Sequence, residues 1–215
     1  METASMNSAI RVIASTYGIL VGLAGIEHGI FEILQGDTPT GDIMINALGP
    51  EYRFWSGASE RAITIIPTFL LTGILAIVFG ILVAIWATKF VDGKYGAHFL
   101  LLLTVVLFLV GGGFAPIFLS IIASIVATRI DKPLPWWQTH LLGSTKEKLA
   151  KSWPWSIVFF VIIFTLTIVI QIFGSPFGDG ITSSLVGISS ILMVVLMLYV
   201  IPSGFAHSAM RFKAE

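Results

Sequence analysis

The chain has 215 residues, no cysteine, a formal net charge of zero and a mean hydropathy of +0.94. Hydrophobic residues make up 56% of it and charged residues only 11%, far from the composition of soluble domains. Without cysteine there are no disulfides or thiolate metal sites, and without a basic cluster nucleic acid is not an expected partner. The composition predicts an all-α integral membrane protein.

Five apolar runs are long enough to cross a hydrocarbon core of about 30 Å, which takes roughly 20 helical residues. They predict one transmembrane domain over residues 1–215, a helical bundle with spans at about 10–34, 62–88, 97–128, 155–173 and 181–205.

The third run carries Gly111-Gly112-Gly113 and Pro116 near its middle, and both residue types are poor helix formers. We expect one long, tilted helix here, kinked or locally unwound between Gly111 and Pro116. The alternative is a re-entrant hairpin, which would reverse the side of every later segment.

Five crossings place the two ends of the chain on opposite sides of the membrane. Lys and Arg accumulate in cytoplasmic loops. The side of the C-terminus then holds nine of these residues, namely Arg53, Arg61, Arg129, Lys132, Lys146, Lys148, Lys151, Arg211 and Lys213. The other side holds Arg11, Lys89 and Lys94. This predicts a cell-membrane protein with its N-terminus outside and its C-terminus in the cytoplasm.

Five of the six tryptophans fall on the predicted cytoplasmic side. An indole ring can bury its apolar part and hydrogen-bond at the headgroups. We therefore expect an aromatic belt at the lipid interface, with membrane lipids as its partners.

Glu27, His28 and Glu32 interrupt the first apolar run. Ionisable groups in a membrane segment cost at least a few kcal/mol each and usually face a protein interior or a water-filled cavity. On the predicted topology, residues from the second and fifth spans reach the same side of the membrane. The predicted ligand or proton site comprises Glu27, His28, Glu32, Glu60, Arg61 and His207.

The spacing of these residues leaves their chemistry open. His28 and Glu32 are four residues apart and share a helix face, so they could bind a divalent metal with His207 or Glu60 completing the shell. The same groups could relay protons, because histidine titrates near neutral pH. In a purely structural interpretation, Glu27 or Glu32 pairs with an arginine such as Arg61 or Arg53. The sequence contains no nucleotide-binding, hydrolase or zinc-protease motif.

A glycine face on the first span and a threonine stripe on the second are predicted to make contacts between helices. The face of Gly18, Gly22, Gly25 and Gly29 lets another helix approach closely, and it could also bind a second copy or a membrane partner. Thr64, Thr68 and Thr72 recur every four residues, which predicts a hydroxyl stripe on the second span.

The function predicted from these features is binding or transport of a small solute, ion or proton at the cytoplasmic ends of the first, second and fifth helices. One alternative is a membrane enzyme acting on a lipid or isoprenoid at the interface. Another is a structural subunit of a membrane complex. The candidate cofactor is a divalent metal, since a bis-histidine haem would need His28 and His207 to face each other at equal depth. The sequence does not distinguish an enzyme from a transporter.

Overall fold

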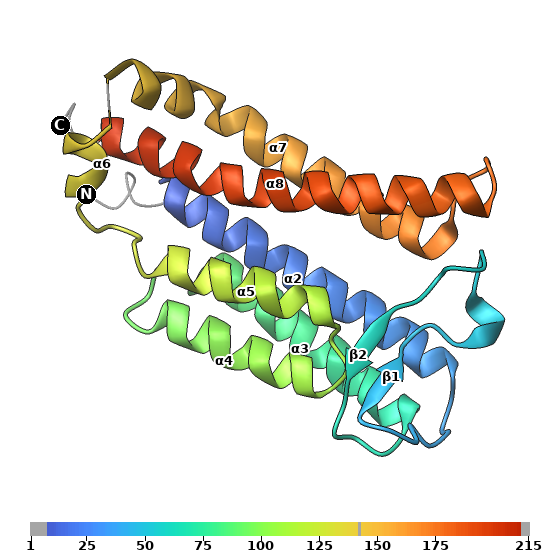
Figure 1. The fold of residues 1–215 in the computed structure, drawn as a ribbon. Helices are drawn as coiled ribbons and strands as arrows, with labels where there is room; N and C mark the ends of the chain where they lie inside the picture. The colour runs from blue at the N-terminus through green and yellow to red at the C-terminus, as the bar shows by residue number, and fades with distance from the viewer. Residues whose placement is uncertain (1–7, 142, 212–215) are drawn as a thin grey trace. The chain divides into compact units, whose positions relative to one another are not determined.

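The structure is a computed structural model that describes residues 8–141 and 143–211. Helices dominate the described chain, and two short strands pair with each other (Figure 1). In chain order the elements are α2 (Ala9–Leu34), β1 (Met44–Asn46), the 3-10 helix η1 (Pro50–Tyr52), β2 (Arg61–Ile63), α3 (Phe69–Lys89), α4 (Gly96–Leu109), α5 (Phe114–Ala127), α6 (Pro135–Thr139), α7 (Gly143–Phe173) and α8 (Asp179–Arg211).

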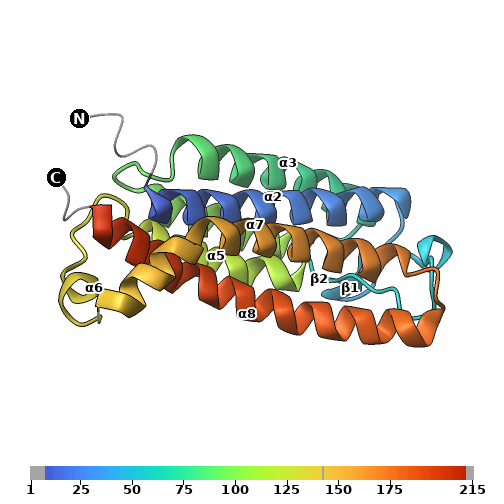
Figure 2. The ribbon, with the colours of Figure 1, turned by 90° about the horizontal axis from the view of Figure 1, so that it is seen from above.

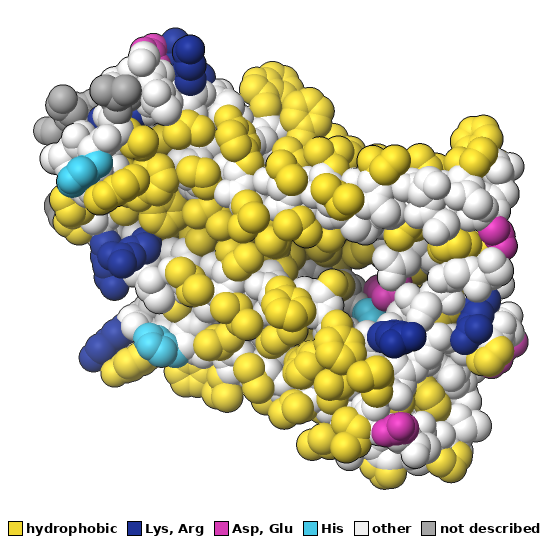
Figure 3. Space-filling model, viewed as in Figure 1, with side chains coloured by type: hydrophobic (Ala, Val, Ile, Leu, Met, Phe, Trp, Pro, Cys, Tyr) yellow, Lys and Arg dark blue, Asp and Glu magenta, His cyan; other side chains and the backbone are white. Residues whose placement is uncertain are grey.

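The helices have the apolar surfaces of a membrane protein. Four of them, α2, α3, α7 and α8, are long and apolar enough to cross a membrane, and α4 and α5 are shorter apolar helices. Ile188 and Ile191 on α8 are 65% and 68% exposed, which in water would be unfavourable but in lipid is not. Figure 3 shows hydrophobic side chains over much of the visible helix surface, with Lys and Arg toward the helix ends.

The described chain divides into two compact units. The N-terminal unit, residues 14–127, contains most of α2 together with α3, α4, α5 and both strands. The C-terminal unit contains residues 8–13 and 128–211, and therefore α6, α7, α8 and the first turn of α2. The polypeptide passes between the units within α2 and again after α5.

In the N-terminal unit, α2 packs against α3 through glycines of both helices. A Cβ atom on Gly22 would lie 2.5 Å from the carbonyl oxygen of Gly80, and one on Gly29 would lie 2.6 Å from that of Gly73. The other glycines of this face contact Ala87 of α3 (Gly18) and Leu107 of α4 (Gly25). The close packing expected of this face is therefore made within the chain. That the same face also binds a partner or a second copy stays a prediction.

The apolar run from 97 to 128 forms two helices and not the expected single kinked one. α4 ends at Leu109, α5 begins at Phe114, and the two pack against each other as a hairpin (Figure 1). Gly111 and Gly113 have φ angles of 102° and 84°, in the left-handed region that favours glycine. A right-handed helix cannot continue through such residues, so the chain reverses. The hairpin alternative is the one that matches the structure.

The second predicted span also begins later than expected, at Phe69 and not at residue 62. Residues 61–63 pair antiparallel with residues 44–46, and Thr64 bridges to Val110 beside the α4–α5 turn. The β-branched run at 63–66 and the following Pro67 favour extended backbone. The predicted helical stripe of threonines is therefore wrong, although the hydroxyl oxygens of Thr64 and Thr72 are 3.0 Å apart in a buried hydrogen bond.

In the C-terminal unit, α7 and α8 form a long antiparallel pair and lie side by side in Figure 2 as well as in Figure 1. Near their connecting loop, the hydroxyl oxygens of Ser175 and Thr182 are 2.8 Å apart. At the opposite end, Nδ1 of His207 is 3.2 Å from the carbonyl oxygen of Ala150. Residues 143–154, expected to precede the fourth span, are part of α7.

The start of α2 lies beside the end of α8 in this unit. A Cβ atom on Gly204 would collide with the side chain of Ile13. The expectation that the chain ends lie on opposite sides of a membrane stays a prediction.

Candidate functional site

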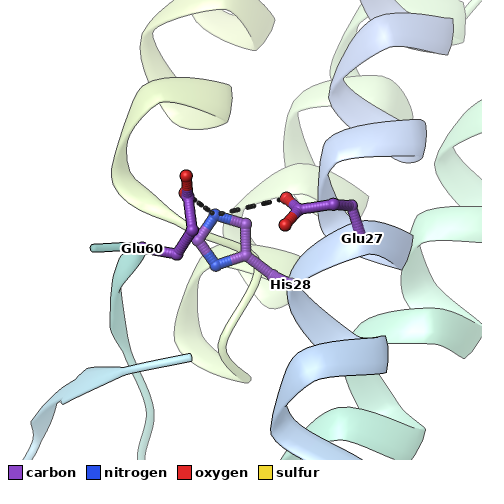
Figure 4. Close-up of side chains that lie close together, drawn as sticks. All are labelled: Glu27, His28 and Glu60. Atoms are coloured by element: carbon purple, nitrogen blue, oxygen red, sulfur yellow. Dashed lines mark ion pairs between the residues drawn. The ribbon is translucent and has the colours of Figure 1, made fainter. Parts of the chain in front are cut away.

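His28 of α2 lies between two carboxylates (Figure 4). Its Nε2 is 3.1 Å from Oε2 of Glu60 and 4.0 Å from Oε2 of Glu27. His28 and Glu60 are buried, and Glu27 is half-buried. One ligand atom from each of the three residues lies within 4.8 Å of the others. We refer to Glu27, His28 and Glu60 as the carboxylate–histidine cluster.

The strand pair brings Glu60 to α2. Glu60 immediately precedes β2, and its backbone nitrogen donates a hydrogen bond to Oδ1 of Asn46 at 2.8 Å. Its carbonyl oxygen accepts one from the nitrogen of Ala47 at 2.7 Å. These bonds extend the β1–β2 ladder by one residue and fix the backbone from which the carboxylate reaches His28.

The turn between α4 and α5 forms a wall of the site. A Cβ atom on Gly113 would lie 2.5 Å from Nε2 of His28, and one on Gly111 would collide with the carboxylate of Glu32. Both glycines have positive φ angles, so the same residues that reverse the chain leave bare backbone against the two side chains. The glycine run was interpreted from sequence only as a kink, and its role at the site was missed.

Glu32 is fully buried one helical turn beyond His28, and neither of its carboxylate oxygens has a hydrogen-bond partner. Oε1 of Glu27 and Nδ1 of His28 are also buried without one. Within residues 8–141 and 143–211, no Lys or Arg forms an ion pair with Glu27 or Glu32. The structural interpretation, in which Arg61 or Arg53 neutralises these carboxylates, is therefore not what the structure contains. Buried carboxylates without such partners require a proton or a cation.

Of the six predicted site residues, the structure brings Glu27, His28 and Glu60 together, with Glu32 on the next turn of α2. Arg61 does not join them: its exposed side chain lines a pocket of about 390 Å³ beside the strand pair, together with Arg53 and Asn46.

His207 belongs to the C-terminal unit, where its ring lies 5.8 Å from that of Trp153. That His207 binds a metal together with His28 and Glu32 stays a prediction. The set with ligand atoms close together is Glu27, His28 and Glu60, because the flexible Glu27 side chain reaches toward the imidazole from the neighbouring helical position.

Comparisons of the chain with protein-family models, with curated proteins and with solved structures found no match. The function is therefore inferred from the chemistry of the carboxylate–histidine cluster. An imidazole gains and loses its proton near neutral pH, and imidazole and carboxylate groups together are common ligands of divalent metal ions.

Proposed function

We propose that this chain is a multi-pass membrane protein that binds and transports a small cation, a proton or a metal ion, at Glu27, His28, Glu60 and Glu32. The observation that carries the proposal is a set of carboxylates packed around a buried histidine, in which Glu27 and Glu32 have no Lys or Arg partner in the described chain. Intramembrane carboxylates and histidines of this kind mark ion pathways and proton relays.

The order of the helices supports a topology that differs from the one expected from five spans: the N-terminus and the cluster change sides, and the C-terminus stays cytoplasmic. α2, α3, α4, α5, α7 and α8 give an even number of traverses, and the even count holds whether the α4–α5 hairpin crosses fully or re-enters. The side of the chain ends then holds ten of the twelve basic residues by sequence position, namely Arg11, Lys89, Lys94, Arg129, Lys132, Lys146, Lys148, Lys151, Arg211 and Lys213. Both ends are then cytoplasmic.

On this topology the cluster lies near the outer surface of the membrane. That side holds only two basic residues, Arg53 and Arg61, against seven of the twelve acidic ones. These are Glu27, Glu32, Asp37, Asp42, Glu51, Glu60 and Asp179. An excess of negative charge raises the local concentration of cations, which favours uptake from the outside.

The proposal is tested by cation flux in proteoliposomes. A pH-sensitive dye reports proton entry, and metal-sensitive dyes report Mn²⁺, Co²⁺ and Zn²⁺ entry. The wild-type protein should carry at least one of these ions, and Glu27→Gln and Glu60→Gln should abolish that flux. Glu51→Gln is the matched control, because Glu51 is an exposed glutamate of η1, between the two strands in the chain.

Equal flux in Glu27→Gln and in wild type, or no flux of any of the four ions through folded wild-type protein, would contradict the proposal.

A further inference from the structure

We infer that the carboxylate–histidine cluster is a binding site for one divalent transition-metal ion, with Glu27, His28 and Glu60 as its direct ligands. This inference rests on the proposed cation-handling function and names the class of cation. It also replaces the ligand set expected from sequence, because Glu32 and His207 are not among the three.

The distances fit a metal ion after a small movement of one side chain. Metal–oxygen and metal–nitrogen bonds of about 2.0–2.2 Å separate neighbouring ligand atoms by roughly 3–3.5 Å. Nε2 of His28 and Oε2 of Glu60 already lie 3.1 Å apart. Oε2 of Glu27 is 4.0 Å from the same nitrogen, and the three ligand atoms lie within 4.8 Å of one another, so the Glu27 carboxylate needs to approach by under about 2 Å.

Hydrogen bonding alone does not satisfy this arrangement. Nε2 of His28 carries at most one proton, so it can donate to Glu60 or to Glu27 but not fully to both. Oε1 of Glu27 is buried without a hydrogen-bond partner. A divalent ion on Nε2 would coordinate both carboxylates at once, and the two negative charges would balance it. The buried, unpartnered carboxylate of Glu32 adds a further negative charge on the adjacent turn of the helix.

The ligand types indicate which metals fit. One imidazole and two carboxylates suit Mn²⁺, Fe²⁺, Co²⁺, Ni²⁺ or Zn²⁺. Cu⁺ prefers the thiolate and thioether ligands that these three residues lack, and Ca²⁺ prefers six to eight oxygen ligands. Three protein ligands also leave coordination positions for water, as in metal sites where ligands exchange.

The test uses purified full-length protein in detergent, stripped with a chelator and titrated with Co²⁺, whose visible spectrum reports its coordination. The wild-type protein should bind one Co²⁺ per chain, and Mn²⁺ and Zn²⁺ should compete for it. Glu27→Gln, His28→Gln and Glu60→Gln should each weaken binding by at least about 100-fold, since loss of an outer-shell partner alone costs 10–100-fold. Glu51→Gln should bind like wild type.

Two further results decide the ligand set. Glu32→Gln should still bind one Co²⁺ with the same spectrum, and complete loss of binding in this variant while Glu27→Gln retains it would overturn the assignment. X-ray absorption of the wild-type complex should show one nitrogen ligand and at least two oxygen ligands, a readout that needs no variant to fold.

The outcomes separate this inference from the proposed function. Folded wild-type protein that binds none of the three ions, yet carries protons in proteoliposomes, would overturn the metal site and leave cation handling standing. Absence of both metal binding and flux would overturn both.

Discussion

At the residue scale, the site depends on backbone as much as on side chains. Gly113 has a φ angle of 84° and lies against the ring of His28, so it combines a turn that favours glycine with a contact that excludes a side chain. Gly41 has a φ angle of 73°, but a Cβ atom there would meet nothing within 4 Å. Both glycines have a positive φ angle, but only Gly113 contacts His28. A comparison of the two positions therefore separates the effect of that contact from the effect of the backbone conformation.

Gly113→Ala and Gly41→Ala should therefore differ in function. Each forces an L-residue into the left-handed region, which costs roughly 1–2 kcal/mol of unfolding free energy. Only Gly113→Ala should also displace His28 and lose cation flux in proteoliposomes. Thermal unfolding measures the first effect and the flux assay the second. Wild-type flux in folded Gly113→Ala would show that the turn is not a wall of the site.

At the element scale, α2 is held by two different kinds of contact. Its glycine face meets the backbone of α3, and its polar residues meet the strand pair and the α4–α5 turn. In the membrane, such close packing replaces the hydrophobic effect as the force that joins helices. The position of His28 relative to Glu60 therefore depends on glycines that lie outside the site.

Gly22→Ala should destabilise the protein by about 1–3 kcal/mol, because its Cβ atom would lie 2.5 Å from a carbonyl oxygen of α3. Gly187→Ala on α8 is the matched control, since a Cβ atom there has nothing within 4 Å. This control should be neutral or stabilising by up to about 1 kcal/mol, because alanine is the better helix former. Chemical or thermal unfolding in detergent measures both. Equal stability of the two variants would contradict close packing of α2 on α3.

Sequence patterns located most of the helices and part of the site. Glu27 and His28 were identifiable because charge in an apolar run is conspicuous, and Glu60 because it lies next to the following run. The expected place of His207 beside the cluster depended on an assumed parity of crossings, and it stays a prediction. The run from 97 to 128 was ambiguous because its hydropathy is continuous across Gly111 and Gly113. Only their backbone angles distinguish a kink from a reversal.

At the scale of the whole molecule, the proposed topology places the cluster on the outer side of the membrane, because the chain reverses between α4 and α5. The absence of native cysteine makes single-cysteine labelling unambiguous. Asp42→Cys, beside β1, should react with a membrane-impermeant reagent in intact cells. Lys94→Cys, between α3 and α4, should react only after permeabilisation. Labelling of Lys94→Cys alone in intact cells would instead restore the five-span topology and place the cluster on the cytoplasmic side.

On the proposed function, the buried carboxylates of Glu27, Glu32 and Glu60 serve to bind a cation and do not stabilise the fold. Carboxylates held for function commonly reduce stability, whereas a partner in a buried ion pair cannot be neutralised without loss of several kcal/mol. A ligand that binds only the folded state stabilises it by about 2.7 kcal/mol at 100 times its Kd. Without metal, Glu27→Gln is therefore expected to be at least as stable as wild type. With metal, the wild type is expected to be the more stable of the two.

The most direct measurement is therefore the thermal unfolding of purified wild type and Glu27→Gln, each in chelator and in saturating Co²⁺. In chelator, Glu27→Gln should be at least as stable as wild type. In Co²⁺, the wild type should gain stability and become the more stable of the two, while Glu27→Gln should not shift. A Glu27→Gln protein that is less stable by several kcal/mol under both conditions, with no shift of the wild type in Co²⁺, would contradict the account.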